Sequence, residues 1–258
     1  MNYQNELDAL FSEWKDKSLQ DGLKSFCADG LMNKGLIKVV YSKNEKYWIR
    51  QRGNENELWN NAPKRIMFLN KDLPNESEDG QDIREWIFRQ HETDITHHHY
   101  KNISLWLYGL LNVDSNNTPP KFNIVNDKLL YSKFMDDTPI AYVNCKKESG
   151  KTSISNKKLI EHINLYQTFI IKEINILNPD IIVCGGGSGV IKDFLIKNVY
   201  KESLKINNWF YYNLEQDKLI IDSFHPSYFG LSQEEIYNRM MENYCDFLNK
   251  FPNFKIVN

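Results

Sequence analysis

The stretch Leu177–Gly185, which reads LNPDIIVCG, decides the fold class of this chain. Asn178-Pro179 ends a long helical pattern, because the residue before a proline is biased away from helical conformation. Ile181–Cys184 is a short, continuous apolar run of the kind that forms a buried parallel strand. Glycines follow at once and turn the chain. Helix, buried strand and tight turn in succession are typical of an α/β protein.

Three other runs in the chain have the same character, namely Ile66–Leu69, Ile140–Val143 and Leu219–Phe224. Segments with helical spacing separate them, the longest of which is Asn156–Leu177, with Ser155 as its N-cap. Further helices are predicted near residues 103–111, 190–198 and 233–251. This β-α-β succession predicts a three-layer α/β/α fold with a short four-stranded parallel sheet.

The rest of the chain is expected to surround this core. Residues 1–36 are predicted to be largely helical, and Ile37–Tyr41 and Lys46–Arg50 to form a β-hairpin. Asn112–Asp137, rich in Asn, Asp and Pro, is predicted to be an irregular surface excursion. We therefore expect one domain over 1–258, with an N-terminal extension of helices and hairpin over 1–60 and a core over 61–251.

Composition places the chain among ordinary globular proteins. It has 258 residues, 41% of them hydrophobic and 26% charged, and a formal net charge of −2. That charge excludes an indiscriminate polycation, but not a nucleic-acid enzyme with its basic residues on one face. Four cysteines without zinc spacing, no secretory signal and no long apolar stretch predict a cytoplasmic protein without a membrane span.

Polar side chains of catalytic type follow three of the apolar runs. Asp72 comes just after the first, Asn144 ends the second, and His225 follows the last, in His225-Pro226-Ser227. In an open parallel sheet, ligands bind outside the carboxyl ends of the strands, so an acid, an amide and an imidazole are expected at one crevice. Each alone has a simpler explanation, because Asp, Asn and His also cap ordinary turns.

Basic and aromatic residues near these motifs suit a nucleic-acid backbone. Lys146, Lys147 and Lys151 follow Asn144, and Ser227 could hold a phosphate. Beyond it, Tyr228 and Phe229 form an apolar tip that could wedge into a base stack. A solvated lysine-rich loop and inward-packed aromatics are the alternatives.

Two other motifs are less informative about function. Gly185–Gly189 lacks the last glycine of the dinucleotide fingerprint and the Walker Lys-Ser/Thr, so it is interpreted as a tight strand-to-helix turn. His97–His99 looks metal-binding, but adjacent histidines cannot share one face of a helix or strand. This run is interpreted as a polar surface or groove segment, and no metal site is predicted.

Taken in order, the motifs resemble the uracil-DNA glycosylase superfamily over roughly residues 60–250. The matching positions are Lys71-Asp72-Leu73-Pro74-Asn75 after the first strand, Asn144 with its basic loop, and His225-Pro226-Ser227. Lys71 and Asn75 stand where the family usually has glycines. The cysteines do not match the cluster ligands of the iron–sulfur branch, so a divergent branch without that cluster is expected.

The resemblance implies a uracil-DNA glycosylase-like fold and hydrolysis of a base–deoxyribose bond in DNA, without metal or cofactor. Asp72 and His225 would be catalytic, and Asn144, Lys71, Pro74 and Phe88 would surround a flipped base. The DNA-binding residues would be those of the basic loop and the apolar tip: Lys146, Lys147, Lys151, Ser227, Tyr228 and Phe229. The base could be uracil, a deaminated purine or a bulky modified pyrimidine, in repair or in defence against phage.

Two alternatives remain at this stage. The chain could be a nucleic-acid-binding module that kept the fold and lost catalysis. It could also be a small-molecule nucleotide enzyme that uses the Gly185–Gly189 turn. DNA is the expected partner in the leading hypothesis, and a monomer the expected state.

Overall fold

The computed structural model describes residues 1–42, 45–72, 81–85, 95, 97–148, 154–186 and 188–254. Its centre is a sheet with the strand order β1-β5-β4-β6-β9-β8-β7. The four inner strands run parallel to one another, as predicted from the four apolar runs: β4 (Ile66–Asn70), β5 (Ala141–Asn144), β6 (Ile181–Gly185) and β9 (Lys218–Ser223).

The sheet is larger than the four-stranded sheet that the sequence predicted, because antiparallel strands extend both edges. β1 (Gly30–Leu31) pairs with β5 at one edge. At the other edge, β8 (Phe210–Asn213) pairs with β9, and β7 (Leu204–Lys205) pairs with β8. The edge strands have two or four residues, too few to show a period in the sequence.

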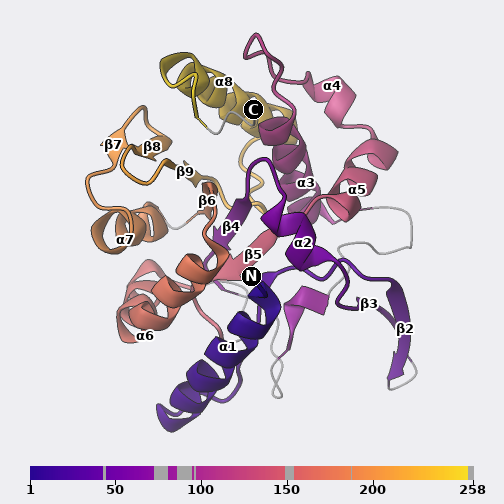
Figure 1. Ribbon diagram of the computed structural model, residues 1–258, viewed down its shortest axis with the longest axis vertical. Helices are drawn as coiled ribbons and strands as arrows, with labels where there is room; N and C mark the ends of the chain where they lie inside the picture. The colour runs from indigo at the N-terminus through magenta and orange to yellow at the C-terminus, as the bar shows by residue number, and fades with distance from the viewer. Residues whose placement is uncertain are drawn as a thin grey trace.

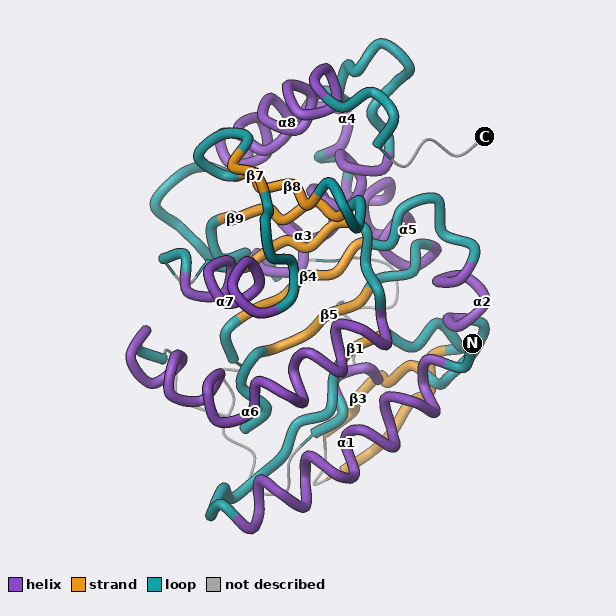
Figure 2. The backbone as a smooth tube through the Cα atoms, turned by 60° about the vertical axis from the view of Figure 1, so that its left-hand side comes forward, coloured by secondary structure: helices purple, strands orange, loops and turns teal. Residues whose placement is uncertain are grey.

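Helices cover both faces of the sheet and make the predicted three layers (Figures 1 and 2). One face carries α1 (Tyr3–Gln20), α6 (Asn156–Leu177) and α7 (Val190–Asn198). The other carries α3 (His98–Leu111), α4 (Phe122–Val125), α5 (Lys128–Asp137) and α8 (Gln233–Lys250).

The alternation of strand side chains joins these layers. In β4, Met67 and Leu69 belong to the core under α1 and α6, whereas Ile66 and Phe68 belong to the core under α3 and α8. Successive side chains of a strand point to opposite faces, so a strand buried on both sides needs a continuous apolar run. Asn70 is the next residue, and its side chain belongs by this alternation to the α3 face.

Local signals explain most helix boundaries. The Ser155 side chain accepts a hydrogen bond from Lys158 N at the start of α6, and Asn178 ends that helix in a left-handed conformation with φ 42°. At the start of α8, Ser232 and Glu235 form a reciprocal capping box. The three helices predicted at 156–177, 190–198 and 233–251 are confirmed, the last of them ending one residue earlier.

Two predicted segments differ from the structure. The N-terminal helix ends at Gln20, and residues 21–36 consist of turns and irregular chain with the short strand β1. Asn112–Asp137 is not an irregular excursion, because it contains α4 and α5. Asp127 is the N-cap of α5, and Tyr131 and Met135 of this helix are buried. The β-hairpin forms over Ile37–Ser42 (β2) and Glu45–Arg50 (β3) as predicted, and a short helix α2 (Glu55–Asn60) and a 3-10 turn η1 (Ile83–Glu85) complete the elements.

The chain leaves β4 and β6 toward opposite faces of the sheet. The connection after β4 leads to α3, and the turn after β6 leads to α7. The carboxyl ends of two adjacent strands that part in this way form a crevice where ligands bind in open α/β sheets. None of the helices in the described part of the chain is long and apolar enough to cross a membrane.

Candidate functional site

The carboxyl ends of the parallel strands bring the predicted Asp72 and Asn144 to the same edge. Asn70 and Asn144 are register partners at the ends of β4 and β5. The pairing continues beyond the strands, since Cys145 N donates to Asn70 O at 2.8 Å and Lys146 N donates to Lys71 O at 2.9 Å. Asp72 is therefore one residue beyond a backbone contact with the loop that follows Asn144.

His225 reaches this edge from the other side. The turn after β6 lies against it, because a Cβ added at Gly186 would be 2.6 Å from His225 N. Gly186 has φ +59° and is one residue beyond Gly185, the register partner of Asn70. The ends of β4, β5 and β9 therefore lie at the same edge of the sheet, which we call the rim. Of the three polar residues that the sequence predicted to meet there, His225 lines the cavity described next, and Asp72 and Asn144 are not among the residues of its wall.

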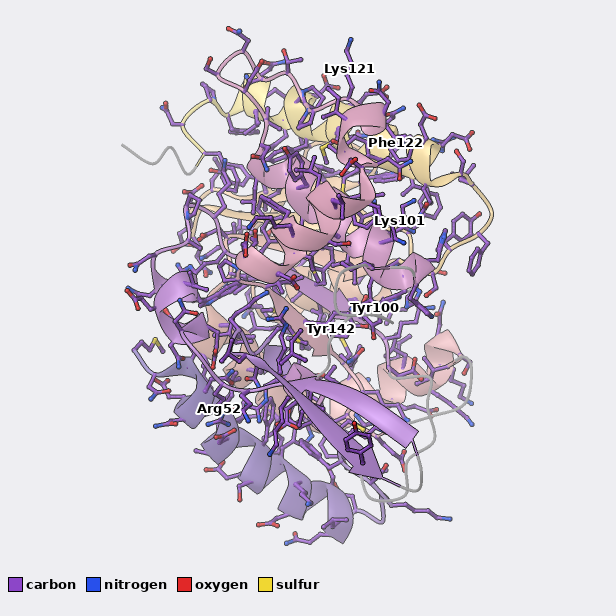
Figure 3. All side chains as sticks on the ribbon, turned by 90° about the vertical axis from the view of Figure 1, so that its right-hand side faces the viewer. Arg52, Tyr100, Lys101, Lys121, Phe122 and Tyr142 are labelled. Atoms are coloured by element: carbon purple, nitrogen blue, oxygen red, sulfur yellow. The ribbon has the colours of Figure 1, made fainter. Side chains whose placement is uncertain are left out.

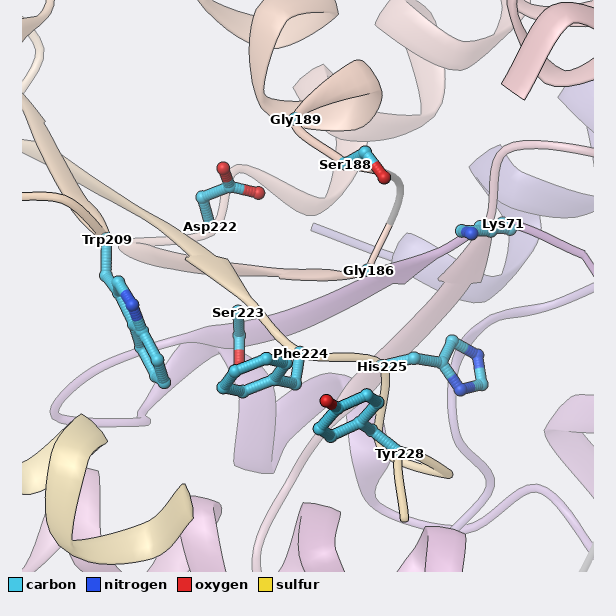
Figure 4. Close-up of a pocket in the computed structure, with 10 residues that line it drawn as sticks. All are labelled: Lys71, Gly186, Ser188, Gly189, Trp209, Asp222, Ser223, Phe224, His225 and Tyr228. Carbon is cyan, nitrogen blue, oxygen red and sulfur yellow. The ribbon is translucent and has the colours of Figure 1, made fainter. Parts of the chain in front are cut away.

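A cavity of about 390 Å³ opens at this rim, between the ends of β4, β6 and β9 (Figure 4). Its walls combine glycines of the turn, an aromatic side, and polar and charged groups. They comprise Lys71, Gly186, Ser188, Gly189, Trp209, Asp222, Ser223, Phe224, His225 and Tyr228. Its size is that of an ordinary small-ligand pocket.

His225 is held neutral and in one tautomer. Burial, and then the charge of Lys71, lower the pKa of His225 to about 4. Its Nδ1 accepts a hydrogen bond from the Ser227 backbone N–H at 3.1 Å. A neutral imidazole that accepts at Nδ1 carries its proton on Nε2. His225 therefore offers an Nε2–H donor at neutral pH without bearing a charge.

Asp72 is a half-buried acid beside two lysines. Burial raises the pKa of its carboxyl, and the charges of Lys146 and Lys71 act in the opposite direction. The carboxylate is thus partly desolvated with positive charge nearby. Such a group can stabilise a developing cation or orient a water molecule.

Asn144 is more enclosed than a base-reading amide would need to be. Its side chain is 1% exposed, and its Nδ2 donates to Asp29 Oδ2 at 3.1 Å. The backbone N of Asn144 donates to the same oxygen at 2.8 Å. Its Oδ1 has no partner among the described residues. Asp29 thus fixes the amide orientation and leaves the carbonyl oxygen as the free group.

Lys147 was predicted to bind DNA, and this prediction is wrong. Its side chain is 1% exposed and is ion-paired with Asp29 and with Glu173 of α6, the latter at 2.7 Å. The ammonium also lies near the rings of Phe11 and Trp14, which belong to α1. Lys147 is a core cation, because its side chain points into the layer under α1 and α6, on the same side as Cys145 two residues before it.

The other predicted contacts divide into three groups. Lys146 remains at the site edge, where its ammonium is 3.4 Å from Glu148 and donates to Glu148 O. Tyr228 and Phe229 form an exposed tip, 39% and 76% exposed, and Ser227 lies beneath it, with its Oγ 2.9 Å from His99 Nδ1. Pro74, Phe88 and Lys151 lie outside the described residues.

No protein-family model matches this sequence, and no curated protein matches it at a significant level.

Four residues at or beneath the rim were not predicted from the sequence to belong to the site. Asn70 is fully buried, neither of its side-chain polar atoms has a partner among the described residues, and it was not predicted as a site residue. His99 and Tyr142 are joined by a hydrogen bond of 2.9 Å, and Asp29 holds Asn144. Asn70 could have been found as the last residue of its strand, but the others depend on contacts between distant segments.

Proposed function

We propose that this protein is a DNA glycosylase that hydrolyses the bond between a flipped base and its deoxyribose. One observation carries the proposal: an acid, an amide and a neutral histidine donor stand at the carboxyl ends of three strands of one parallel sheet, and the histidine and Lys71 line the cavity at that edge. A base taken out of the duplex must meet such groups together, because the bond breaks only when both of its ends are stabilised.

His225 suits the leaving-group end of the reaction. As the C1′–N bond breaks, its electron pair goes to the base, and negative charge grows on a base oxygen. A neutral Nε2–H can donate to that oxygen without an ion pair in the ground state, so its help is greatest in the transition state.

Asp72 suits the sugar end. The sugar gains positive charge as the base departs, and a carboxylate stabilises that charge. A water held by the carboxylate then forms the new C1′–O bond and gives its proton to that carboxylate, while the base leaves as the anion that His225 stabilises. The free Oδ1 of Asn144 is an acceptor, so a base that reaches it would have to supply an N–H donor.

The test is incubation with oligonucleotides that carry uracil, deaminated purines or bulky modified pyrimidines, followed by alkali to cleave abasic sites. We expect strand cleavage for at least one base. Asp72→Asn and His225→Ala should each lower the single-turnover rate by about a hundredfold or more, since each removes a charge-stabilising group. Asp193→Asn is the matched control, because that carboxylate is exposed on α7 and pairs with Lys192.

Failure has two forms. Unchanged base release in both site variants would place the chemistry elsewhere. DNA binding without base release from any substrate would leave the nucleic-acid-binding module as the function.

A further inference from the structure

The first turn of α3 holds the loop that carries His225. Asn102 Nδ2 donates to Pro226 O at 2.6 Å, and His98 Nε2 lies 3.4 Å from Tyr228 O. The ring of His98 also stacks on Phe229, with centroids 4.4 Å apart. His98 therefore helps to hold this loop, a role beyond the polar surface or groove segment that was predicted for the histidine run.

Within that support, one line of hydrogen bonds runs from the sheet to His225. Tyr142 Oη lies 2.9 Å from His99 Nε2, and His99 Nδ1 lies 2.9 Å from Ser227 Oγ. The backbone N of Ser227 then donates to His225 Nδ1. The rings of His99 and His225 have centroids 5.3 Å apart, and Tyr142 lies beside Tyr100 (Figure 3).

The middle of this line is buried and uncharged. His99 is 7% exposed. Burial, followed by the charges of His225, His97 and His98, holds the pKa of His99 well below its usual range. Burial raises the pKa of Tyr142, so its phenolic proton is retained. Each hydrogen bond of the line therefore joins neutral groups. The neutral His99 ring carries its proton on either Nδ1 or Nε2, so the line has two possible proton orders.

The chemistry of the groups selects one order. A phenol is a stronger acid than an aliphatic hydroxyl, and an imidazole nitrogen is a stronger acceptor than a phenol oxygen. We propose that His99 is a positioning residue: Tyr142 O–H donates to its Nε2, and its Nδ1–H donates to Ser227 Oγ, which leaves the Ser227 hydroxyl hydrogen free for a ligand. His99 and His225 are then opposite tautomers, the first protonated on Nδ1 and the second on Nε2.

This arrangement makes Ser227 an oriented donor at the rim. Its oxygen is occupied by His99, so its hydrogen points to an acceptor such as a phosphate oxygen of the nucleic-acid backbone. That consequence rests on the proposed function, whereas the proton order does not. The two can therefore fail separately.

Long-range ¹H–¹⁵N correlation of the imidazole nitrogens tests the proton order on the intact protein at pH 7. We expect the Nδ1–H tautomer for His99 and the Nε2–H tautomer for His225. His97→Gln assigns the exposed neighbour and should leave both patterns unchanged. An Nε2–H tautomer at His99 would overturn the proposal.

Tyr142→Phe provides the second measurement, since it keeps the ring and removes only the hydroxyl. We expect the His99 nitrogens to become a mixture of tautomers while the pattern of His225 stays the same, because its partner is a backbone N–H. Binding to an oligonucleotide with an abasic site should weaken by about tenfold, the size of one lost hydrogen bond. An unchanged His99 pattern would refute the role of Tyr142, whatever the outcome of the glycosylase assay.

Discussion

His162 and His225 both occupy places where a positive charge is unfavourable. Burial, with Lys146 and Lys147 nearby, lowers the pKa of His162 to about 3, and that of His225 is about 4. In the unfolded chain a histidine has a pKa near 6.5. Stability is therefore complete above about pH 6.5 and falls as the pH drops toward 4, because only the unfolded state binds the proton there.

The difference between the folded and unfolded pKa values predicts that the free energy of unfolding falls at acid pH. Replacing one of these histidines should make that fall smaller. Each histidine should cost on the order of 3 kcal/mol of stability between pH 6.5 and pH 4. His162→Gln removes one such contribution at a position on α6 that is not among the residues of the cavity wall. In urea titrations, the free energy of unfolding of the variant should rise relative to that of the wild type at pH 4.5 but not at pH 7.5. If the difference between variant and wild type were the same at both pH values, His162 would not titrate in this way.

A side chain at Gly186 should destabilise the protein in two ways, through backbone strain and through a clash with the backbone of His225. Its φ of +59° disfavours a side chain, and a Cβ there would meet the backbone N of His225. Gly186→Ala should cost at least 2 kcal/mol by the order of magnitude for strain plus overpacking, and should displace the histidine loop. Gly22→Ala, with φ +87° and open space around the Cβ, isolates the strain alone, at about 1 kcal/mol. Similar losses in both variants, measured by urea unfolding, would contradict the close approach.

The polar residues of the rim could be predicted to the extent that they end strands. Asp72, Asn144 and His225 follow apolar runs, and a parallel sheet gathers such ends. Asp29 and His99 could not be found in this way, because each meets its partner across more than one hundred residues of chain. Sequence pattern reports neighbours within an element, not pairs formed by packing.

At the scale of elements, a buried ion cluster joins β5 to the N-terminal segment. Lys147 lies between Asp29 and Glu173, and burial raises the pKa of Glu173 well above its usual range. The loop after β5 is tied to the same segment, since Cys27 N donates to Lys147 O at 2.6 Å.

Removal of the lysine should therefore affect stability before it affects binding. Lys147→Met leaves the Asp29 carboxylate buried without its cation, which costs about 3–5 kcal/mol at such sites. Lys146→Met should cost little stability, because that ion pair lies near the surface, but should weaken DNA binding at low salt. Denaturant midpoints and binding at two salt concentrations distinguish the two lysines; a salt-dependent loss in Lys147→Met with normal stability would restore it as a DNA contact.

Element prediction succeeded where the signal is local. α6 and α7 have their predicted bounds because a serine cap, Asn178-Pro179 and a glycine turn act on adjacent residues. β1 and β7 have two residues each, and only their pairing with neighbours makes them strands. α5 was missed because Asp127 was taken as a sign of irregular chain, whereas its side chain caps the helix through Leu130 N.

At the scale of the molecule, the N-terminal extension is packed into the core. Leu7, Phe11 and Trp14 of α1 are buried with Ile170 and Ile174 of α6. Deletion of residues 1–20 would expose this face of α6 and uncover Lys147. We expect the truncated protein to lose cooperative unfolding and to bind a hydrophobic dye, as judged by near-UV circular dichroism and fluorescence. A truncated chain that unfolds in one sharp transition would show that the extension is dispensable.

The in-register pairing of β4 with both β5 and β6 limits how this site can change over evolution. A single-codon insertion within β4 would put Leu69 where Asn70 stands and invert the facing of every residue after it. Insertions beyond Asp72 would leave the ladder untouched. Evolution can therefore lengthen the loop after Asp72, but it cannot lengthen β4 without changing the direction of the side chains at its end.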